Sequence, residues 1–138
     1  MTAIAPRLIL VALCLALPLS AAALQPQTQG EVRFLSGGVG AEESSALKAV
    51  RDQYNLHLLF SAKDTGEYLS DIEVRIADAA GKTLVETVSE GPQLFAQLKP
   101  GRYIIDAVYG GKSLRKTVSI TEKRGASLSL IWPESLED

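Results

Sequence analysis

From Asn55 onward, apolar and polar side chains alternate with a period of two, which is the repeat of a β-strand with one buried face. Turn-forming residues interrupt this alternation about every ten residues, for example at 78–82, 100–101 and 110–111. The Gly-Gly pair at 110–111 is typical of the two-residue turn of a β-hairpin. Short strands at this spacing predict a mainly β domain, built as a sandwich or as a barrel.

Seven alternating runs lie between residues 56 and 132, and each of them predicts one strand. Their inward-facing residues are large and numerous enough to fill the space between two sheets, and no polar pattern typical of a barrel lumen appears. We therefore predict a seven-stranded antiparallel β-sandwich over residues 56–132. Residues 133–138 are mostly polar and are predicted to form a tail.

The segment before these strands has the period of a helix. Leu47, Val50 and Tyr54 recur at spacings of three and four residues and form one apolar stripe, and two glutamates lie in the first turn, where carboxylates suit the helix dipole. We predict one N-terminal helix over residues 41–55. Because a helix this short is marginally stable alone, we expect it to pack on a surface.

Residues 24–40 are predicted to be a flexible segment that ends in a glycine-rich loop. Residues 24–30 are mostly polar and have no period. The stretch 36–40 has three glycines in five residues, and the backbone entropy of glycine disfavours regular structure. Residues 31–35, between these two stretches, could form one short strand.

The first 23 residues have the three zones of a secretory signal peptide. Arg7 supplies a positive charge, an apolar run extends from residue 8 to residue 19, and small residues at 20–23 offer a cleavage site. The run is shorter than the roughly 20 residues that span a membrane, and Pro18 interrupts it. We expect residues 1–23 to be removed on export, which predicts a periplasmic or secreted protein with no stable membrane span.

Removal of these 23 residues would leave 115 of the 138 residues and would take away the single cysteine, Cys14. No disulfide could then form, and stability would depend on one hydrophobic core. Of the 14 basic residues, 13 would remain against 16 acidic ones, a net charge of −3. This balance lacks the basic footprint of a nucleic-acid-binding protein, so we expect no nucleic-acid partner.

Four short motifs, taken together, resemble a known family. They are residues 68–74 (YLSDIEV), 78–82 (DAAGK), 90–92 (EGP) and 98–103 (LKPGRY). In this order they are similar to the carboxypeptidase regulatory-like domain, whose fold is a transthyretin-like, Ig-like Greek-key sandwich of seven strands. In its L-x-P-G-x-Y motif, Pro100 and Gly101 would reverse the chain and Tyr103 would face inward. Residues 36–56 resemble part of small exported bacterial proteins that carry this domain and have no assigned activity.

The resemblance suggests two classes of enzyme, and the residues exclude both. A zinc carboxypeptidase needs a His-x-x-Glu pair and a second histidine as metal ligands, but His57 is the only histidine and Phe60 stands three positions after it. The transthyretin-like hydroxyisourate hydrolases end in Tyr-Arg-Gly-Ser, which this chain lacks. We therefore expect no enzyme activity, no metal and no cofactor, and we expect His57 to be a solvent-facing strand residue.

Strict alternation assigns each side chain of a strand either to the core or to the surface. It points Tyr103 and Trp132 inward, and we expect them, with the turn at Pro100 and Gly101, to be structural anchors. It points four apolar residues outward, and these form the candidate interaction surface unless the helix covers some of them: Leu59, Ile104, Val108 and Ile131. Alternation also points Lys116 inward. Because an unpaired buried ammonium is costly, this predicts an edge strand or a bulge there.

These observations predict an exported, non-catalytic β-sandwich that is a binding or accessory module of the cell envelope, with an unknown protein or small molecule as its partner. Two alternatives remain open. One is a small-molecule carrier like transthyretin, with a ligand between subunits, which an exposed apolar strand edge that pairs subunits would favour. The other is an unrecognised hydrolase, which a deep pocket joining His57 to carboxylates would favour.

Overall fold

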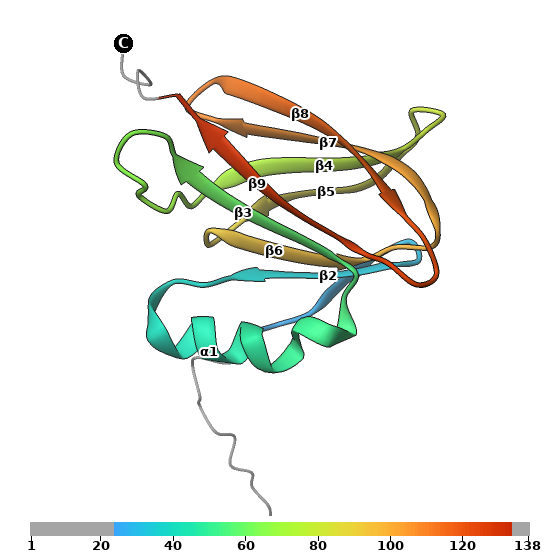
Figure 1. The fold of residues 1–138 in the computed structure, drawn as a ribbon, viewed down its shortest axis with the longest axis horizontal. Helices are drawn as coiled ribbons and strands as arrows, with labels where there is room; N and C mark the ends of the chain where they lie inside the picture. Colours follow the sequence, from blue (N-terminus) through green and yellow to red (C-terminus); the bar gives the residue numbers. More distant parts are fainter. Residues whose placement is uncertain (1–23, 134–138) are drawn as a thin grey trace, which may run out of the picture.

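The computed structural model describes residues 24–133, which form two β-sheets and one α-helix (Figure 1). The predicted signal peptide, residues 1–23, and the predicted tail beyond Pro133 lie outside the described residues. In chain order the elements are β1 (Gln27–Gln29), β2 (Val32–Gly37), α1 (Gly40–Val50), a 3-10 turn (Arg51–Gln53), β3 (Leu56–Ala62), β4 (Ile72–Asp78), β5 (Thr83–Ser89), β6 (Gln93–Gln97), β7 (Gly101–Tyr109), β8 (Lys112–Ile120) and β9 (Ala126–Trp132).

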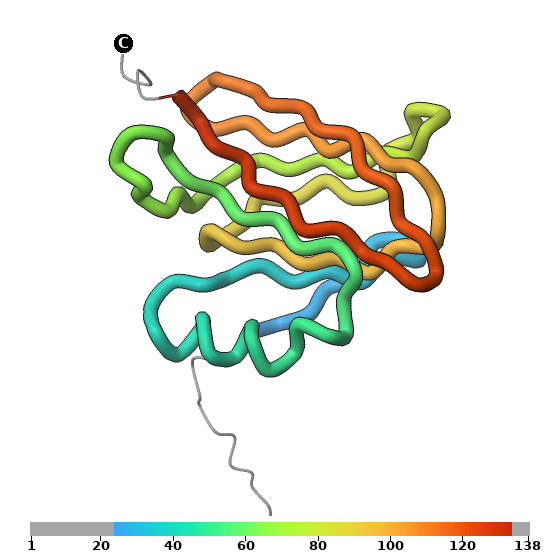
Figure 2. The backbone as a smooth tube through the Cα atoms, in the orientation of Figure 1, coloured from blue at the N-terminus to red at the C-terminus, as the bar shows by residue number. Residues whose placement is uncertain are grey.

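The strands form two stacked layers (Figure 2). The five-stranded sheet has the order β1-β2-β6-β3-β9, and the four-stranded sheet has the order β5-β4-β7-β8. Neighbouring strands run antiparallel, except that β3 and β9 pair in parallel. The prediction of a mainly β, sandwich-like fold with one N-terminal helix is confirmed.

Two details of the strand prediction are wrong. Each of the seven predicted runs contains a strand, but the described residues hold nine strands, because β1 and β2 precede the helix. The sandwich is also not fully antiparallel, because residues 121–125 carry the chain from β8 to the other sheet, where β9 enters alongside β3. Alternation is the same in parallel and antiparallel strands, so the sequence pattern cannot indicate the direction of β9.

The prediction for residues 24–40 is partly wrong. The short strand expected at 31–35 is present within β2, but residues 27–29 form β1 instead of a flexible segment, and β2 continues into the predicted loop as far as Gly37. β2 pairs with β6, and Phe34 and Leu35 are buried on the two faces of the sheet. Gly37 continues this strand, and a Cβ atom on Gly91 would lie 2.3 Å from the Gly37 carbonyl oxygen, so the two backbones pack closely. The sandwich therefore begins with β1, and not at residue 56. A strand buried on both faces lacks the alternation on which the prediction depended.

α1 lies against the outer face of the five-stranded sheet (Figure 1). Its Leu47 packs with Leu35 of β2, Phe95 of β6 and Tyr54, in a cluster separate from the main core, and Val50 packs against this cluster. The predicted apolar stripe is therefore confirmed. The helix begins one residue earlier than predicted and ends at Val50 instead of residue 55, because the chain leaves it through the 3-10 turn and is already extended at Tyr54.

The main core lies between the two sheets and is built from apolar side chains of both. Tyr103 is 6% exposed and Trp132 is fully buried, so both predicted anchors belong to this core. Pro100 and Gly101 connect β6 to β7 and are exposed, as expected for the turn that precedes Tyr103. The Trp132 ring packs on Phe60 of the same sheet, with the ring centroids 6.1 Å apart.

The four-stranded sheet has β5 at one edge and β8 at the other. At β5, the side-chain amide of Gln29 donates to the backbone oxygen of Glu86 at 2.9 Å and accepts from its N–H at 3.0 Å, so β1 covers part of this edge. At β8, Lys116 lies opposite Ile105, whose side chain is buried in the core, yet Lys116 is exposed. The prediction of an edge strand at Lys116 is confirmed, because at an edge the side chain can reach water.

The variant Lys116→Leu is expected to stay folded and to self-associate more than the parent. It removes an inward-pointing charge that discourages pairing of β8 with the edge of another molecule. Sedimentation velocity of both proteins at equal concentration measures the effect. Lys123→Leu, which makes the same change in the exposed connection after β8, is the control. Unfolding of Lys116→Leu, or sedimentation identical to the parent, would contradict the role of this lysine.

Candidate functional site

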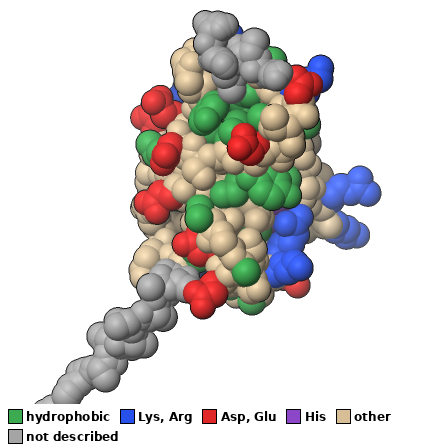
Figure 3. Space-filling view, turned by 90° about the vertical axis from the view of Figure 1, so that its left-hand side faces the viewer, with side chains coloured by type: hydrophobic (Ala, Val, Ile, Leu, Met, Phe, Trp, Pro, Cys, Tyr) green, Lys and Arg blue, Asp and Glu red, His purple; other side chains and the backbone are tan. Residues whose placement is uncertain are grey.

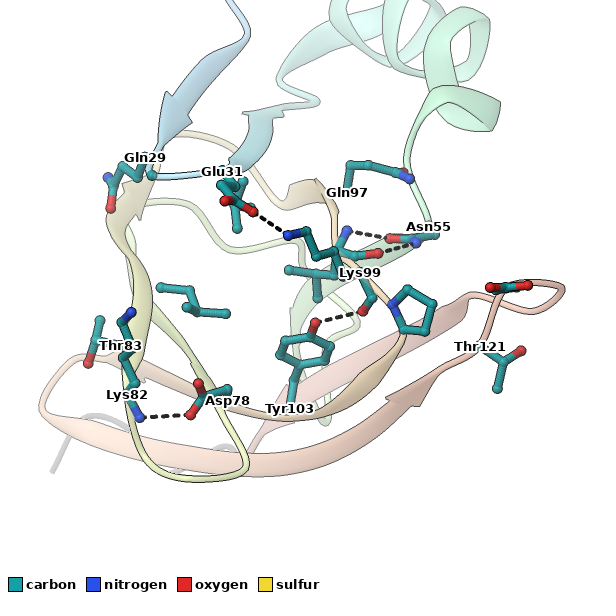
Figure 4. A pocket seen from close by; sticks show the side chains of 16 residues that line it. Gln29, Glu31, Asn55, Asp78, Lys82, Thr83, Gln97, Lys99, Tyr103 and Thr121 are labelled. Carbon is teal, nitrogen blue, oxygen red and sulfur yellow. Dashed lines mark hydrogen bonds and ion pairs between the residues drawn. The ribbon is translucent and has the colours of Figure 1, made fainter.

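A cleft of about 1060 Å³ opens at one end of the sandwich (Figure 4). This end carries the turn between β4 and β5 and the connection between β6 and β7. Its apolar lining comes from Val32, Leu84, Leu98 and the Tyr103 ring. Its polar lining comes from several loops and strand ends: Gln29, Glu31, Asn55, Asp78, Lys82, Thr83, Gln97, Lys99, Thr121 and Glu122.

Two polar side chains of the cleft clamp the segment between β6 and β7. The Asn55 side chain accepts a hydrogen bond from the Leu98 N–H at 2.8 Å and donates one to the Leu98 carbonyl at 2.7 Å. The Tyr103 hydroxyl donates to the Lys99 carbonyl at 2.6 Å. Both side chains therefore use part of their hydrogen-bonding capacity to hold the fold.

Other polar side chains of the lining also hold their own loops. Asp78 Oδ1 accepts from the backbone N–H groups of Ala80 and Lys82 at 3.0 and 2.9 Å, which fixes the turn between β4 and β5. Thr121 Oγ1 accepts from the Arg124 N–H at 2.9 Å in the connection between β8 and β9. These local bonds explain why such residues stand at turns.

An ion pair between Lys99 and Glu31 spans the mouth of the cleft (Figure 4). The Lys99 ammonium lowers the pKa of Glu31, chiefly through its hydrogen bond, and Lys82 lowers it further from a greater distance. In turn, the Glu31 carboxylate raises the pKa of Lys99. Both side chains are exposed, so water screens their attraction and the pair can separate at little cost.

This arrangement suits binding better than catalysis. Acid–base or nucleophilic catalysis needs a nucleophile beside a base, or a group with a shifted pKa that is free to exchange its proton. The lining holds no histidine or cysteine. Two of its three carboxylates, Glu31 and Asp78, are engaged by an ammonium and by backbone N–H groups, and the third, Glu122, is exposed. The cleft can hold a ligand through its shape, its apolar lining and a few neutral hydrogen bonds.

The four residues of the predicted interaction surface do not lie together. Leu59 of β3 and Ile131 of β9 stand on neighbouring strands of the five-stranded sheet, with Leu59 half-buried and Ile131 48% exposed. Ile104 and Val108 are half-buried on β7, in the other sheet. α1 covers the β2 and β6 part of the first sheet, so it does not bury Ile131. The sequence predicts outward positions correctly but cannot tell that they belong to two different sheets.

On the four-stranded sheet, Ile104 and Val108 flank a row of paired charges. Asp106 lies between them and accepts hydrogen bonds from Arg75 at 3.2 Å and from Arg115 at 2.7 Å. The Arg115 guanidinium, through its hydrogen bond, contributes most to lowering the pKa of Asp106. These three charges pair with one another across three strands, so they are not available to a partner.

At the end opposite the cleft, Leu59 belongs to a different group of apolar residues, which we call the loop-end patch: Val39, Ala41, Leu59 and Tyr68. Ala41, Leu59 and Tyr68 border a hollow of about 450 Å³ whose rim also includes Ser44 and Gln93, and Val39 stands in the chain between two glycines of the same lining. Val39 is 57% and Tyr68 66% exposed. Figure 3 shows this end of the molecule, with apolar surface at its centre, acidic side chains on its left and above it, and basic side chains on its right.

Sequence reasoning missed Val39 and Tyr68, because both lie outside the alternating runs. Tyr68 follows β3 in the loop 63–71, and Val39 stands between two glycines before α1. A large aromatic residue in a loop otherwise rich in charged residues is the signal that could have drawn attention to Tyr68.

The prediction that His57 faces solvent is only partly right, because its ring is half-buried. It meets the edge of the Phe95 ring, with the centroids 4.6 Å apart. Nε2 lies 3.0 Å from the Arg51 carbonyl, which can only accept, so the neutral ring carries its proton there and leaves Nδ1 facing the Ser127 hydroxyl at 3.4 Å. Arg51 donates to the same hydroxyl at 3.1 Å. Arg51 and Ser127 are exposed, and with His57 and Asp52 they line a surface hollow of about 510 Å³.

His57 makes stability depend on pH. Burial lowers the pKa of His57 below its ordinary value of 6.5. As the pH falls, the unfolded chain therefore takes up this proton first, and the folded state loses stability between pH 6.5 and the lower folded pKa. We expect the parent to lose stability from about pH 8 to about pH 5.5, and His57→Gln to lose less. Urea denaturation of both proteins at the two pH values measures this; equal losses would contradict it.

Within residues 24–133, no helix is long and apolar enough to cross a membrane. In the same part of the chain, no three or more His, Cys, Asp or Glu residues are grouped so that they could hold a metal ion. Comparison of the sequence with protein-family models and with curated proteins gives no match.

Proposed function

We propose that the protein is an exported, non-catalytic binding module of the cell envelope, and that it binds a protein partner at the loop-end patch. The observation that carries this proposal is the Tyr68 ring, which is 66% exposed beside a hollow on the surface. Large aromatic side chains of a monomer are mostly buried, whereas tyrosines at the centre of an interface contribute much of the binding free energy.

The backbone around Tyr68 supports this proposal, because it is held in place. Tyr68 forms an isolated β-bridge with Ser61 of β3. The next residue, Leu69, is buried and donates its N–H to the Phe60 carbonyl at 3.1 Å. A partner that binds an already positioned side chain does not have to order the loop, and so it retains more of the interaction free energy.

We also propose that the chain belongs to the carboxypeptidase regulatory-like family, with the transthyretin-like Greek-key strand order. The L-x-P-G-x-Y motif supports this assignment through its geometry. The Tyr103 hydroxyl reaches back to the Lys99 carbonyl, four residues earlier, at the entry to β7. A tyrosine that closes the corner between two strands in this way is a recurrent feature of Greek-key sandwiches.

The export part of the proposal rests on the order of charged, apolar and small residues in the first 23 positions. Intact-mass measurement of the protein from its native host tests it. We expect a mature species that begins near Leu24. A species that keeps the apolar run from residue 8 to residue 19 would contradict export by cleavage and would favour a membrane anchor.

Photo-crosslinking in the native host tests the proposed binding surface. A photoreactive phenylalanine analogue replaces Tyr68 in one variant and Thr117, which is exposed on β8, in a control variant. We expect one discrete adduct, with the same partner in repeated experiments, from position 68 and not from position 117. Adducts that are equal at both positions, or none at position 68, would contradict the proposal.

The cleft favours a second candidate, a small-molecule carrier. Its volume of about 1060 Å³ is at the upper end of the roughly 300–1,000 Å³ that is typical of ligand sites. The cleft lies within one chain, however, whereas a transthyretin-like carrier would hold its ligand between subunits. Since several of its polar side chains are engaged in holding loops, this candidate ranks below partner binding.

A further inference from the structure

Resting on the function proposed above, we infer that the partner presents a cationic segment with an apolar side chain at its centre. The apolar part of this inference comes from the hollow beside Leu59 and Tyr68, which can accept one large side chain. The cationic part comes from the acidic residues of two chain segments that border the hollow, 63–71 and 90–92.

Four exposed carboxylates belong to the two segments that contribute Tyr68 and the Pro92 side of the hollow: Asp64, Glu67, Asp71 and Glu90. Glu67 directly precedes Tyr68, and Glu90 stands two residues before Pro92. Across residues 63–71 and 90–92, Lys63 is the only base. In Figure 3, acidic side chains lie to the left of and above the apolar centre, whereas basic side chains lie to its right.

These carboxylates differ from Asp106 and Glu31, whose charges are paired. Asp106 pairs with two arginines, and Glu31 pairs with Lys99. Within residues 24–133, the ion pairs do not include any of the four carboxylates of the loop-end patch. Their charge is therefore available to steer a positively charged partner and to fix its orientation around the apolar centre.

The same charges disfavour the other possible occupants. If two copies met patch to patch, their acidic rims would oppose each other, and like charges in an interface weaken it. Residues 134–138 contain three acidic residues and no base, so they would also be repelled. A partner segment with lysine or arginine on both sides of an apolar residue could place the apolar side chain in the hollow and pair its charges with the carboxylates beside the hollow.

Two synthetic peptides test the inference on the purified protein. The first has one phenylalanine between lysines, and the second has the same phenylalanine between glutamates. We expect the lysine peptide to shift the backbone amide signals of Leu59, Tyr68 and Gln93 in two-dimensional NMR spectra, and we expect its affinity to fall as salt is added. Equal binding of both peptides would overturn the inference, as would binding that shifts signals of the cleft instead.

Variants separate the apolar contribution from the charge contribution. We expect Tyr68→Ala to weaken binding of the lysine peptide about tenfold or more, and Glu67→Lys to weaken it about threefold to tenfold. Glu122→Lys makes the same charge change at the opposite end of the sandwich and should leave the affinity unchanged. If Glu67→Lys and Glu122→Lys have equal effects, only net charge matters and the inference is wrong.

The outcomes also separate this inference from the proposed function. Suppose that position 68 crosslinks to a partner whose contacting segment is acidic. This result would contradict the inference that the partner segment is cationic, but it would still support the proposed binding surface. Failure to crosslink at position 68 would remove the surface itself, and this inference with it.

Discussion

Replacing Trp132 with alanine is expected to lower the free energy of unfolding by about 3–5 kcal/mol, a large part of the stability of a domain of this size. Trp132 is fully buried at the end of β9, and its ring lies 6.1 Å from that of Phe60 and 6.0 Å from that of Tyr109. Its indole N–H donates to the Lys112 carbonyl of β8 at 2.9 Å. The substitution therefore leaves a cavity and an unpaired carbonyl, and it removes a contact between the two sheets.

Urea denaturation followed by circular dichroism measures this loss, because Trp132 is the only tryptophan and its fluorescence disappears with the substitution. Ile131→Ala, at the exposed neighbouring position, is the control and should change stability by less than about 1 kcal/mol. Trp132→Phe keeps most of the ring volume and removes the indole donor, so its smaller loss estimates the hydrogen bond to Lys112. Equal midpoints for Trp132→Ala and Ile131→Ala would mean that this side chain is not in the core.

We expect Tyr103→Ala to cost about 3–5 kcal/mol as well, and Tyr103→Phe only about 0.5–1.5 kcal/mol. The alanine variant loses both the buried ring and the hydroxyl, whereas the phenylalanine variant loses only the hydrogen bond to the Lys99 carbonyl. Burial raises the pKa of Tyr103, with a further contribution from Asp78, so the hydroxyl keeps its proton and remains a donor.

Thermal unfolding of the parent and the two Tyr103 variants measures both contributions. The order of midpoints should be parent, Tyr103→Phe, Tyr103→Ala, with most of the loss in the last step. If Tyr103→Phe destabilises as much as Tyr103→Ala, the corner hydrogen bond and not burial of the ring holds β7 in place. Such a result would contradict the assignment of Tyr103 to the core.

The sequence is a good guide to strands that have one buried and one open face. In β4, for example, Ile72, Val74 and Ile76 are buried, and Glu73 is exposed, as alternation requires. The same reasoning placed Tyr103 and Trp132 correctly in the core and Lys116 at an edge. These positions are predictable because the alternation of apolar and polar residues identifies the face of each strand that packs against the core.

The sequence is a poor guide where burial depends on elements that are distant in the chain. In β2, Phe34 is buried in the core between the two sheets, and the next residue, Leu35, is buried beneath the helix. The sequence of β2 therefore does not alternate between apolar and polar residues. The candidate site suffers from the same limit. The alternation predicts Leu59 as part of a surface, but its neighbours Ala41 and Tyr68 reach it only through the folding of the chain before α1 and of the loop 63–71. Pairing in space, and not periodicity along the chain, defines such a site.

The parallel pairing of β9 with β3 also determines when this protein can fold. Leu56 lies opposite Ala126, 70 positions further along the chain, so the five-stranded sheet cannot be completed before nearly all of the described residues have been synthesised. Contacts between such distant segments form slowly, because a long loop must close first. The strand order therefore keeps a nascent chain from completing its larger sheet until β9, the last described strand, has left the ribosome.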